Sequence, residues 1–293
     1  MFIIKLQGGL GNQMFQYAFA SIISKNKGCI LKLDKSFLDN SLTNEGFTYR
    51  PFELSIFRNA NLEASTLEIQ TLTKSCFYCA FLKKFGLYKS KIYIEPSLDY
   101  HPEAMFINPP MYIKGYFQSY KYFENNIDYI KDIFTFSIES LNEKNYKLLS
   151  KLKSMISISV HIRRGDYITN KKAKQFHGNL SFKYYLKAID IMASKNKVFT
   201  LVFFSDDIKW VKEKFQKLPY SKVFIDYNKN ENAWIDMLLM SSCSHNIIAN
   251  SSFSWWAAFL NNNPEKIVIA PKKWYADPKI NTNNLVPIKW IRL

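Results

Sequence analysis

The chain has 293 residues, of which 47% are apolar and 16% aromatic, so its composition is that of a folded protein and not of a disordered one. The length is typical of two domains. The net charge of +16 is compatible with a nucleic acid, an anionic membrane surface or a phosphorylated substrate, but the lysines are scattered, which is typical of a solvated surface.

The four cysteines give no sign of a metal site or of secretion. Cys76 and Cys79 form a C-x-x-C pair in an apolar run, whereas a zinc site would need a second pair or suitably placed histidines. The first residues, "MFIIKLQGGLG", lack the basic region and apolar core expected of a signal segment, and no apolar run approaches the ~20 residues of a membrane span. The sequence therefore predicts a cytoplasmic protein with no metal, and peripheral association with the inner membrane stays open as an alternative.

The first half begins as a parallel α/β unit. We predict a strand over 2–6, a glycine-rich turn, a buried helix over 14–25 and a strand over 29–34. The segment 63–91 is predicted to be helical, either packed on the sheet or lying on a membrane surface. A strand, a turn at Gly115 and a helix start follow over 111–126.

The second half alternates strands and helices more regularly. A polar helix over 137–154 marks the boundary between two predicted domains, an N-terminal one over 1–145 and a C-terminal one over 146–293. Packing of the C-terminal tail on the N-terminal domain stays open as an alternative. Strands are predicted over 156–162, 199–204, 222–226, 246–249 and 266–270, with helices over 181–194, 208–216, 233–243 and 252–262. This alternation predicts a doubly wound sheet, which binds ligands beyond the carboxyl ends of its strands.

Two adjacent arginines, Arg163 and Arg164, follow the strand 156–162. Because strand side chains alternate, Ser157, Ser159, His161 and Arg163 share the face opposite the apolar residues. A buried arginine requires a negative partner, and its planar fork fits two phosphate oxygens. The alternative is a salt bridge from either arginine to Asp166.

The next strand ends on Ser205, Asp206 and Asp207. A carboxylate there could accept hydrogen bonds from the edge of guanine or from a ribose. The same three residues could instead cap the helix over 208–216.

A third strand end leads into Asn250, Ser251 and Ser252, before an aromatic helix. Backbone N–H groups at such a helix start bind anions, although capping alone would also explain the serines. The turn "GGLGNQ" over 8–13 departs from the dinucleotide fingerprint, because Met14 stands at the place of its third glycine. It still allows close approach of a ligand, and Asn12 offers an amide there.

The sequence contains neither Asp-x-Asp nor G-x-S-x-G. The segment His101-Pro102-Glu103 lacks the cysteine pair of a zinc deaminase. A bound diphosphate would therefore have to be neutralised by arginine and a helix N-terminus rather than by a metal ion.

Five motifs in order, "GGLGNQMFQYAFA", "GYFQSYKYF", "HIRRGDY", "FSDD" and "HNIIANSSFSWWAAFL", resemble the bacterial α-1,2-fucosyltransferases of glycosyltransferase family 11. The resemblance implies a GT-B-like α/β fold, with two Rossmann-like domains facing each other across a cleft. It implies metal-independent, inverting transfer of L-fucose from GDP-β-L-fucose to the 2-hydroxyl of a galactose residue on a glycan. The C-terminal domain would bind GDP-fucose and the N-terminal domain would lie on the acceptor side.

The resemblance also implies roles for individual residues. His161 would lie near the nucleotide, Arg163 would contact the β-phosphate and Arg164 would support it. Asp206 would bind guanine, with Asp207 as the alternative acid. The other donor-binding residues would be Gly11, Asn12, Asn250, Ser251, Ser252 and Phe253.

A general base must be an acid or histidine within reach of the acceptor hydroxyl. Asp166 and His177 are candidates because both follow the arginine turn, and Asp166 could instead hold an arginine in place. Two other functions remain open. One is a fucosyltransferase of another linkage, to a sugar 6-hydroxyl or a protein hydroxyl. The other is a non-enzymatic protein whose basic surface binds nucleic acid or a membrane.

Overall fold

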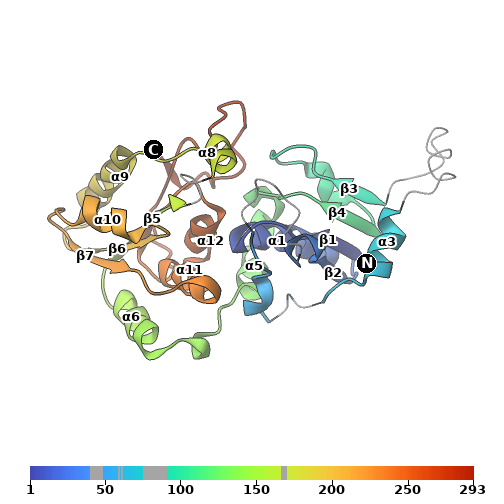
Figure 1. Cartoon of the computed structure of the whole chain (residues 1–293), viewed down its shortest axis with the longest axis horizontal. Coiled ribbons are helices and arrows are strands. Elements are labelled where there is room, and N and C mark those ends of the chain that lie inside the picture. The colour runs from blue at the N-terminus through green and yellow to red at the C-terminus, as the bar shows by residue number, and fades with distance from the viewer. Residues whose placement is uncertain (40–48, 59, 61, 75–90, 166–169) are drawn as a thin grey trace. The chain divides into compact units, whose positions relative to one another are not determined.

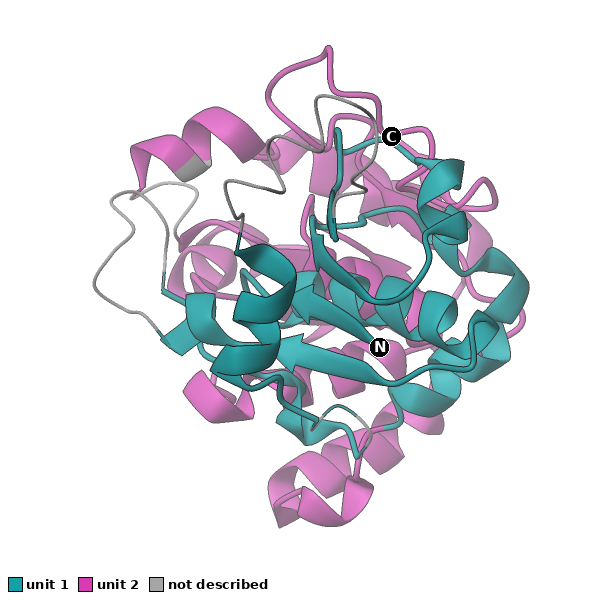
Figure 2. Cartoon of the chain, turned by 90° about the vertical axis from the view of Figure 1, so that its right-hand side faces the viewer, with its two compact units in different colours: residues 1–43, 49–135 teal, residues 44–48, 136–293 magenta. Residues whose placement is uncertain are grey.

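The structure is a computed structural model that describes residues 1–39, 49–58, 60, 62–74, 91–165 and 170–293 (Figure 1). The chain divides into two compact units, which Figure 2 distinguishes by colour. Described residues up to Thr135 form the first unit, and Phe136–Leu293 belong to the second. The division therefore lies before the predicted boundary between residues 145 and 146. The reason is that helix α6 (Glu143–Lys153) packs against α11 (Ala233–Ser241) of the second unit.

The first unit is built on a four-stranded parallel sheet with the order β2-β1-β4-β3. Helix α1 connects the parallel strands β1 and β2 and packs against both of them. The strands and α-helices of this unit are β1 (Phe2–Lys5), α1 (Leu10–Asn26), β2 (Leu31–Asp34), α2 (Ser36–Asp39), α3 (Thr66–Thr73), β3 (Ile92–Ile94), β4 (Met111–Lys114) and α5 (Ile127–Ile133).

Helix α1 is buried along most of its length, as its apolar sequence predicts. Phe19 stacks on Phe117, with ring centroids 3.9 Å apart. The helix begins at Leu10 rather than near Met14, with Gly9 as its N-cap. The glycine-rich turn therefore supplies the first helical turn itself.

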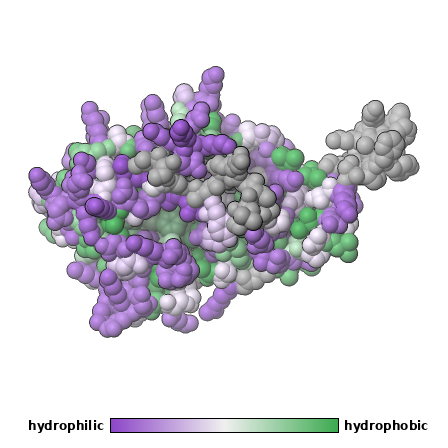
Figure 3. Space-filling model, in the orientation of Figure 1, coloured by the Kyte–Doolittle hydropathy of each residue, from purple (hydrophilic) through white to green (hydrophobic). Residues whose placement is uncertain are grey.

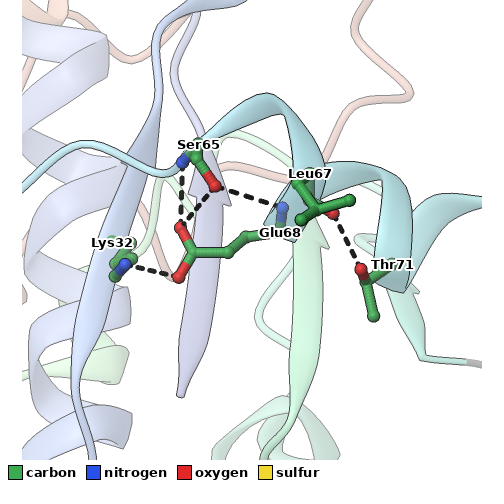
Figure 4. Close-up of polar contacts among 5 residues, drawn as sticks. All are labelled: Lys32, Ser65, Leu67, Glu68 and Thr71. Atoms are coloured by element: carbon green, nitrogen blue, oxygen red, sulfur yellow. Dashed lines mark hydrogen bonds and ion pairs between the residues drawn. The ribbon is translucent and has the colours of Figure 1, made fainter.

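Helix α3 begins with a capping box, shown in Figure 4. Ser65 Oγ accepts a hydrogen bond from the Glu68 N–H, and the Glu68 carboxylate accepts one from the Ser65 N–H. Lys32 of β2 forms an ion pair with the same carboxylate, so the cap also attaches the helix to the sheet. Residues 75–90, which include the C-x-x-C pair and most of the predicted membrane-surface helix, lie outside the described residues.

The second unit contains six parallel strands in the order β7-β6-β5-β8-β9-β10. This is the order of a Rossmann sheet, with the first strand in the centre and the chain extending first to one side and then to the other. After α6 the strands and α-helices are β5 (Ser157–Ile162), α8 (Lys171–His177), α9 (Phe182–Lys195), β6 (Thr200–Ser205), α10 (Ile208–Phe215), β7 (Ser221–Ile225), α11, β8 (His245–Ile247), α12 (Ser252–Leu260), β9 (Val268–Ala270) and β10 (Ile291–Arg292).

Strand β10 was not predicted, because only two residues of the C-terminal tail form it. The end of the tail pairs with β9, where Ile291 lies opposite Ile269, and completes the second sheet. Packing of the tail on the first domain stays a prediction.

The two faces of β5 differ, as the alternation of its residues predicts. Its apolar side chains are Ile158, Val160 and Ile162. They lie in a core cluster with residues of α9 and α10. Ile156, expected on the same face, precedes the strand and is 45% exposed. On the other face, Ser159 accepts a hydrogen bond from Asn246 at 2.7 Å, and His161 contacts Phe253 of α12. One face of β5 is therefore core, and the other carries polar side chains toward the carboxyl edge.

The surface agrees with the scattered charge of the sequence. Exposed lysines lie on several separate helices, among them α6, α8 and α10. Hydrophilic residues cover much of the face seen in Figure 3, with apolar residues scattered between them. Within the described ranges, no helix has the length and apolar character needed to cross a lipid bilayer.

Candidate active site at the carboxyl edge of the second sheet

The second sheet has a topological switch point between β5 and β8. The chain builds outward from β5 on one side and from β8 on the other, so the loops after these two strands lead away from each other. Ligands of doubly wound sheets bind in the crevice that this leaves at the carboxyl ends. The loop after β5 begins with Arg163, and the loop after β8 contains Asn250 and Ser251.

Arg163 is held by the acid that follows the neighbouring strand. The parallel register pairs Ile162 with Ser205, so the next residues of the two chains also meet. Arg163 Nη1 lies 3.1 Å from Asp206 Oδ2, and Asp206 Oδ1 accepts a hydrogen bond from the Arg164 N–H at 2.9 Å. Asp206 thus anchors the arginine turn, and its contact with guanine stays a prediction.

Arg164 is fixed by a second acid and by an aromatic ring. Its Nε lies 3.3 Å from Asp207 Oδ2, and its guanidinium carbon lies 3.8 Å from the centroid of the Trp210 ring. Asp207 also caps α10 by accepting a hydrogen bond from the Trp210 N–H. Of the two readings of Ser-Asp-Asp, capping therefore holds for Asp207, while Asp206 faces the site.

Gly165 is required by the close approach of the Asp206 carboxylate. A Cβ at this position would lie 2.8 Å from Asp206 Oδ2, which is closer than side chains pack. The glycine of the "RRGD" motif therefore allows the ion pair between Arg163 and Asp206 to form.

His161 is buried beneath this turn and is 5% exposed. Burial, assisted by the neighbouring Arg163 charge and opposed by Asp206, lowers the pKa of His161 to about 4, so the imidazole is neutral at pH 7. Its ring lies 5.8 Å from the Phe253 ring, and its Nδ1 has no hydrogen-bond partner among the described residues. His161 thus brings an uncharged polar atom to the switch point.

The loop between β8 and α12 is anchored by Asn250, which is 2% exposed. Its Nδ2 donates hydrogen bonds to the carbonyl of His177 at 2.9 Å and to that of Trp274 at 3.1 Å. Ser251 is the N-cap of α12 and accepts a hydrogen bond from the Phe253 N–H. Ser252 is the first helical residue. Capping by Ser251 is therefore observed, and binding of an anion at the same helix start stays a prediction.

His177 is the last residue of α8, and its main-chain carbonyl accepts a hydrogen bond from Asn250 of the β8–α12 loop. The His177 ring contacts the rings of Phe176 and Tyr275, whose centroids lie 4.8 Å and 6.1 Å from its own. The structure therefore places this candidate base beside the predicted phosphate loop. The other candidate, Asp166, lies outside the described residues.

The first unit carries Gly11 and Asn12 in the first turn of α1. The Gly9 carbonyl accepts the Asn12 N–H at 2.9 Å, and Asn12 Oδ1 accepts a hydrogen bond from Gln118 Nε2 at 2.8 Å. Gln118 belongs to the loop after β4. Two of the recognised motifs, far apart in the sequence, therefore meet at the carboxyl edge of the first sheet.

The structure thus gathers most of the predicted site residues at the carboxyl edge of the second sheet, with Gly11 and Asn12 in the first unit. Sequence analysis missed the residues that support them: Trp210, Trp274 and Gln118. Two of them had a signal in the sequence. Gln118 lies in the motif "GYFQSYKYF", and Trp210 stands three residues after the cap Asp207, a spacing that places two side chains on the same face of a helix.

The family model "Glycosyl transferase family 11" matches residues 1–293. The chain belongs to glycosyltransferase family 11. Two Escherichia coli relatives align over nearly their whole length. The O-antigen biosynthesis glycosyltransferase WbnK is 37% identical, covering 98% of this chain and 99% of the relative. An alpha-1,2-colitosyltransferase is 32% identical, covering 99% and 98%. The protein is therefore a glycosyltransferase of this family, as the five motifs predicted.

Among solved structures, POFUT1 in complex with GDP matches with a TM-score of 0.51 at 13% identity, covering 90% of this chain and 96% of that one. At this identity the likeness concerns the fold alone. Together with the two parallel sheets, it confirms the predicted GT-B-like α/β class built from Rossmann-like units.

Proposed function

We propose that this family 11 glycosyltransferase moves L-fucose from GDP-β-L-fucose to the 2-hydroxyl of a galactose residue on a surface glycan or oligosaccharide, forming an α-1,2 linkage with inversion. The observation that carries the proposal is Arg163 at the switch point of a Rossmann sheet, held by Asp206 and followed across the switch point by the N-terminus of α12. A guanidinium and helix amides suit a diphosphate.

In this reaction the bond from the sugar carbon to the β-phosphate oxygen breaks as the acceptor oxygen attacks the opposite face. Negative charge grows on the leaving GDP, and positive charge grows on the sugar ring. Arg163 and Arg164 stabilise the leaving phosphate more in the transition state than in the ground state, which accelerates the step. Their positions are fixed beforehand by Asp206, Asp207 and Trp210.

The acceptor proton must pass to a base, for which Asp166 and His177 remain our candidates. Burial lowers the pKa of His161 and so favours its neutral form, and we propose that its contribution is a hydrogen bond. We propose no metal ion and no cofactor in this step. The charge on the diphosphate would then be met by arginines and backbone amides.

A second donor, GDP-colitose, is favoured by the 32% identical relative named alpha-1,2-colitosyltransferase. Colitose is L-fucose without its 3-hydroxyl. A site that hydrogen-bonds a hydroxyl rejects the analogue lacking it by about 10⁴-fold or more, whereas a pocket built without that partner rejects the extra hydroxyl by only about 10²-fold. The ratio of kcat/KM for the two donors therefore identifies the natural one.

The deciding experiment measures GDP release by the purified protein with GDP-fucose, GDP-colitose and GDP-mannose, each with and without a panel of galactose-ended glycans, in chelator. We expect release from GDP-fucose that depends on the acceptor, and linkage analysis showing an α-1,2 product. If the protein preferred GDP-colitose, colitose would replace fucose as the proposed donor sugar and the proposed mechanism would stay the same. A 1,6-linked product would change the linkage, and no release from any donor would refute the proposal.

We place the reaction in the cytoplasm, with GDP-fucose and the glycan as partners and without nucleic acid. Peripheral binding to the inner membrane is tested separately by flotation with liposomes containing anionic lipids. Recovery of the protein with the liposomes at physiological salt would support it.

A further inference from the structure

Glu95 occupies an unusual place at the carboxyl edge of the first sheet. It follows β3 directly, and its N–H donates to the Lys114 carbonyl at the end of the neighbouring strand β4. Its carboxylate then reaches across to the loop after β4. Oε2 accepts the Tyr116 N–H at 2.6 Å, and Oε1 accepts the Phe117 N–H at 2.9 Å. One side chain therefore satisfies two successive backbone donors.

The loop is shaped to receive this carboxylate. A Cβ at Gly115 would lie 2.4 Å from Glu95 Cβ and 2.7 Å from Oε2, so only glycine leaves room. Phe117 is fully buried and has a φ of 51°, a left-handed conformation that is unfavourable for a residue with a side chain. The surrounding contacts must hold it there, and the two hydrogen bonds to Glu95 are among them.

Keeping a carboxylate in this place is costly. Burial raises the pKa of Glu95 to about 7, although the two backbone hydrogen bonds favour its charged form. An apolar residue would avoid that cost but would leave two N–H groups without their acceptors. The arrangement indicates that the exact shape of the 115–118 turn matters for more than stability.

The turn leads directly to Asn12. Residue 118 follows the strained Phe117, and its Nε2 donates a hydrogen bond to Asn12 Oδ1 at 2.8 Å. This hydrogen bond fixes which end of the Asn12 amide is oxygen. The Nδ2 end then lies over Gly8, where a glycine Cβ would be 2.4 Å from it. Gln118 therefore turns the donor end of Asn12 toward the glycine-rich turn.

We propose that Glu95 is a positioning residue, whose carboxylate holds the 115–118 turn so that Gln118 orients the Asn12 amide toward the sugar-nucleotide donor. The inference rests on the proposed function and on the donor-binding role that the family resemblance implies for Asn12. Glu95 itself lies one loop away from Asn12 and acts through Gln118. It is a link between β3, β4 and α1 that the sequence motifs do not contain.

The test is a double-mutant cycle with Glu95→Gln and Asn12→Ala. Glutamine keeps the size of the side chain but offers only one acceptor oxygen, so one of the two N–H groups loses its partner. We expect kcat to fall by about 10- to 100-fold, with a smaller change in the KM for GDP-fucose, because misplacement of a contacting group by about an ångström has effects of this size. In the Asn12→Ala background, Glu95→Gln should lower kcat by less than about 3-fold.

Two further variants separate positioning from general destabilisation. Glu68→Gln removes a carboxylate that also accepts a backbone N–H in the first unit, at the α3 cap, and it should leave kcat within about 2-fold of the parent. Gln118→Leu breaks the link without disturbing the buried carboxylate and should behave as Glu95→Gln does. The inference would be overturned if the kcat loss of the Glu95→Gln/Asn12→Ala double variant equalled the product of the two single losses. A parental kcat in Gln118→Leu would overturn it as well.

A measurement that needs no activity keeps the inference distinct from the proposed function. The side-chain amide NMR signal of Asn12 is identified by its loss in Asn12→Ala. It should shift in Glu95→Gln and stay in place in Glu68→Gln. An inactive parent overturns the proposed function, whereas an Asn12 signal unchanged by Glu95→Gln overturns the positioning role.

Discussion

Replacing Arg163 by lysine tests the central charge of the site. The positive charge and the ion pair with Asp206 can both survive, because the partner oxygen lies only 3.1 Å from one guanidinium nitrogen and both side chains are about a quarter exposed or less. What lysine cannot reproduce is the planar fork that donates to two oxygens at once. The variant therefore separates two-pronged donation from charge.

The size of the effect follows from what is removed. A hydrogen bond to a charged group contributes about 1.5–3 kcal/mol, and each ~1.4 kcal/mol corresponds to a factor of ten in rate. We therefore expect kcat to fall by about 10²-fold. The KM for GDP-fucose should change less, because charge on the β-phosphate grows only as the bond breaks.

The assay compares initial rates of GDP release, at saturating acceptor, for the parent, Arg163→Lys and Arg292→Lys. Arg292 is a matched control, since its guanidinium donates to three backbone carbonyls of the tail and contributes to packing rather than chemistry. It should lower the melting temperature and leave kcat near the parental value. Turnover of Arg163→Lys within about 3-fold of the parent would show that the fork has no part in leaving-group stabilisation.

Two further predictions concern Gly165 of the arginine turn and Asp236 of α11. Gly165→Ala should lower kcat by about 10-fold, because its Cβ would push Asp206 away from Arg163; the melting temperature serves as the control. Asp236→Asn should raise the free energy of unfolding at pH 8 by about 1–4 kcal/mol and change it little at pH 4. Burial raises the pKa of Asp236 to about 7, so stability is lost as pH rises toward 7, and asparagine keeps the hydrogen bond from Asn228. Denaturant titration at both pH values measures this, and equal effects would contradict it.

The second sheet was predictable because its strands are short apolar runs separated by amphipathic helices. Five of its six strands were found from this pattern alone. Strand β10 was missed because two residues carry no periodicity, and their pairing with β9 depends on contacts distant in sequence. In the first sheet, α1 began earlier than predicted because a glycine turn can itself become the first turn of a helix.

The types of residue at the site were predictable, but their partners were not. The predicted partner of Arg163 was a diphosphate, with a salt bridge from either arginine to Asp166 as the alternative, and Asp206 was not considered as its partner. The structure pairs it with Asp206, because residues that follow paired parallel strands meet at the sheet edge. Glu95 lies in no recognised motif, and Gln118 lies in one to which no role was given, since their roles depend on two loops of the first unit coming together. The partners of the site residues therefore follow from the pairing register of the strands and not from the sequence motifs.

The role of Asp206 can be decided by comparing two nucleotides. If Asp206 reads guanine, Asp206→Asn should weaken binding of GDP much more than that of IDP, which lacks the 2-amino donor. If it anchors the arginine turn, both should weaken by a similar factor, and kcat should fall as well. Both of its oxygens already accept hydrogen bonds or ion pairs from Arg163 and Arg164, so we expect the second result. Calorimetry with the two nucleotides measures the ratio, and a loss at least 10-fold larger for GDP would restore guanine recognition as its role.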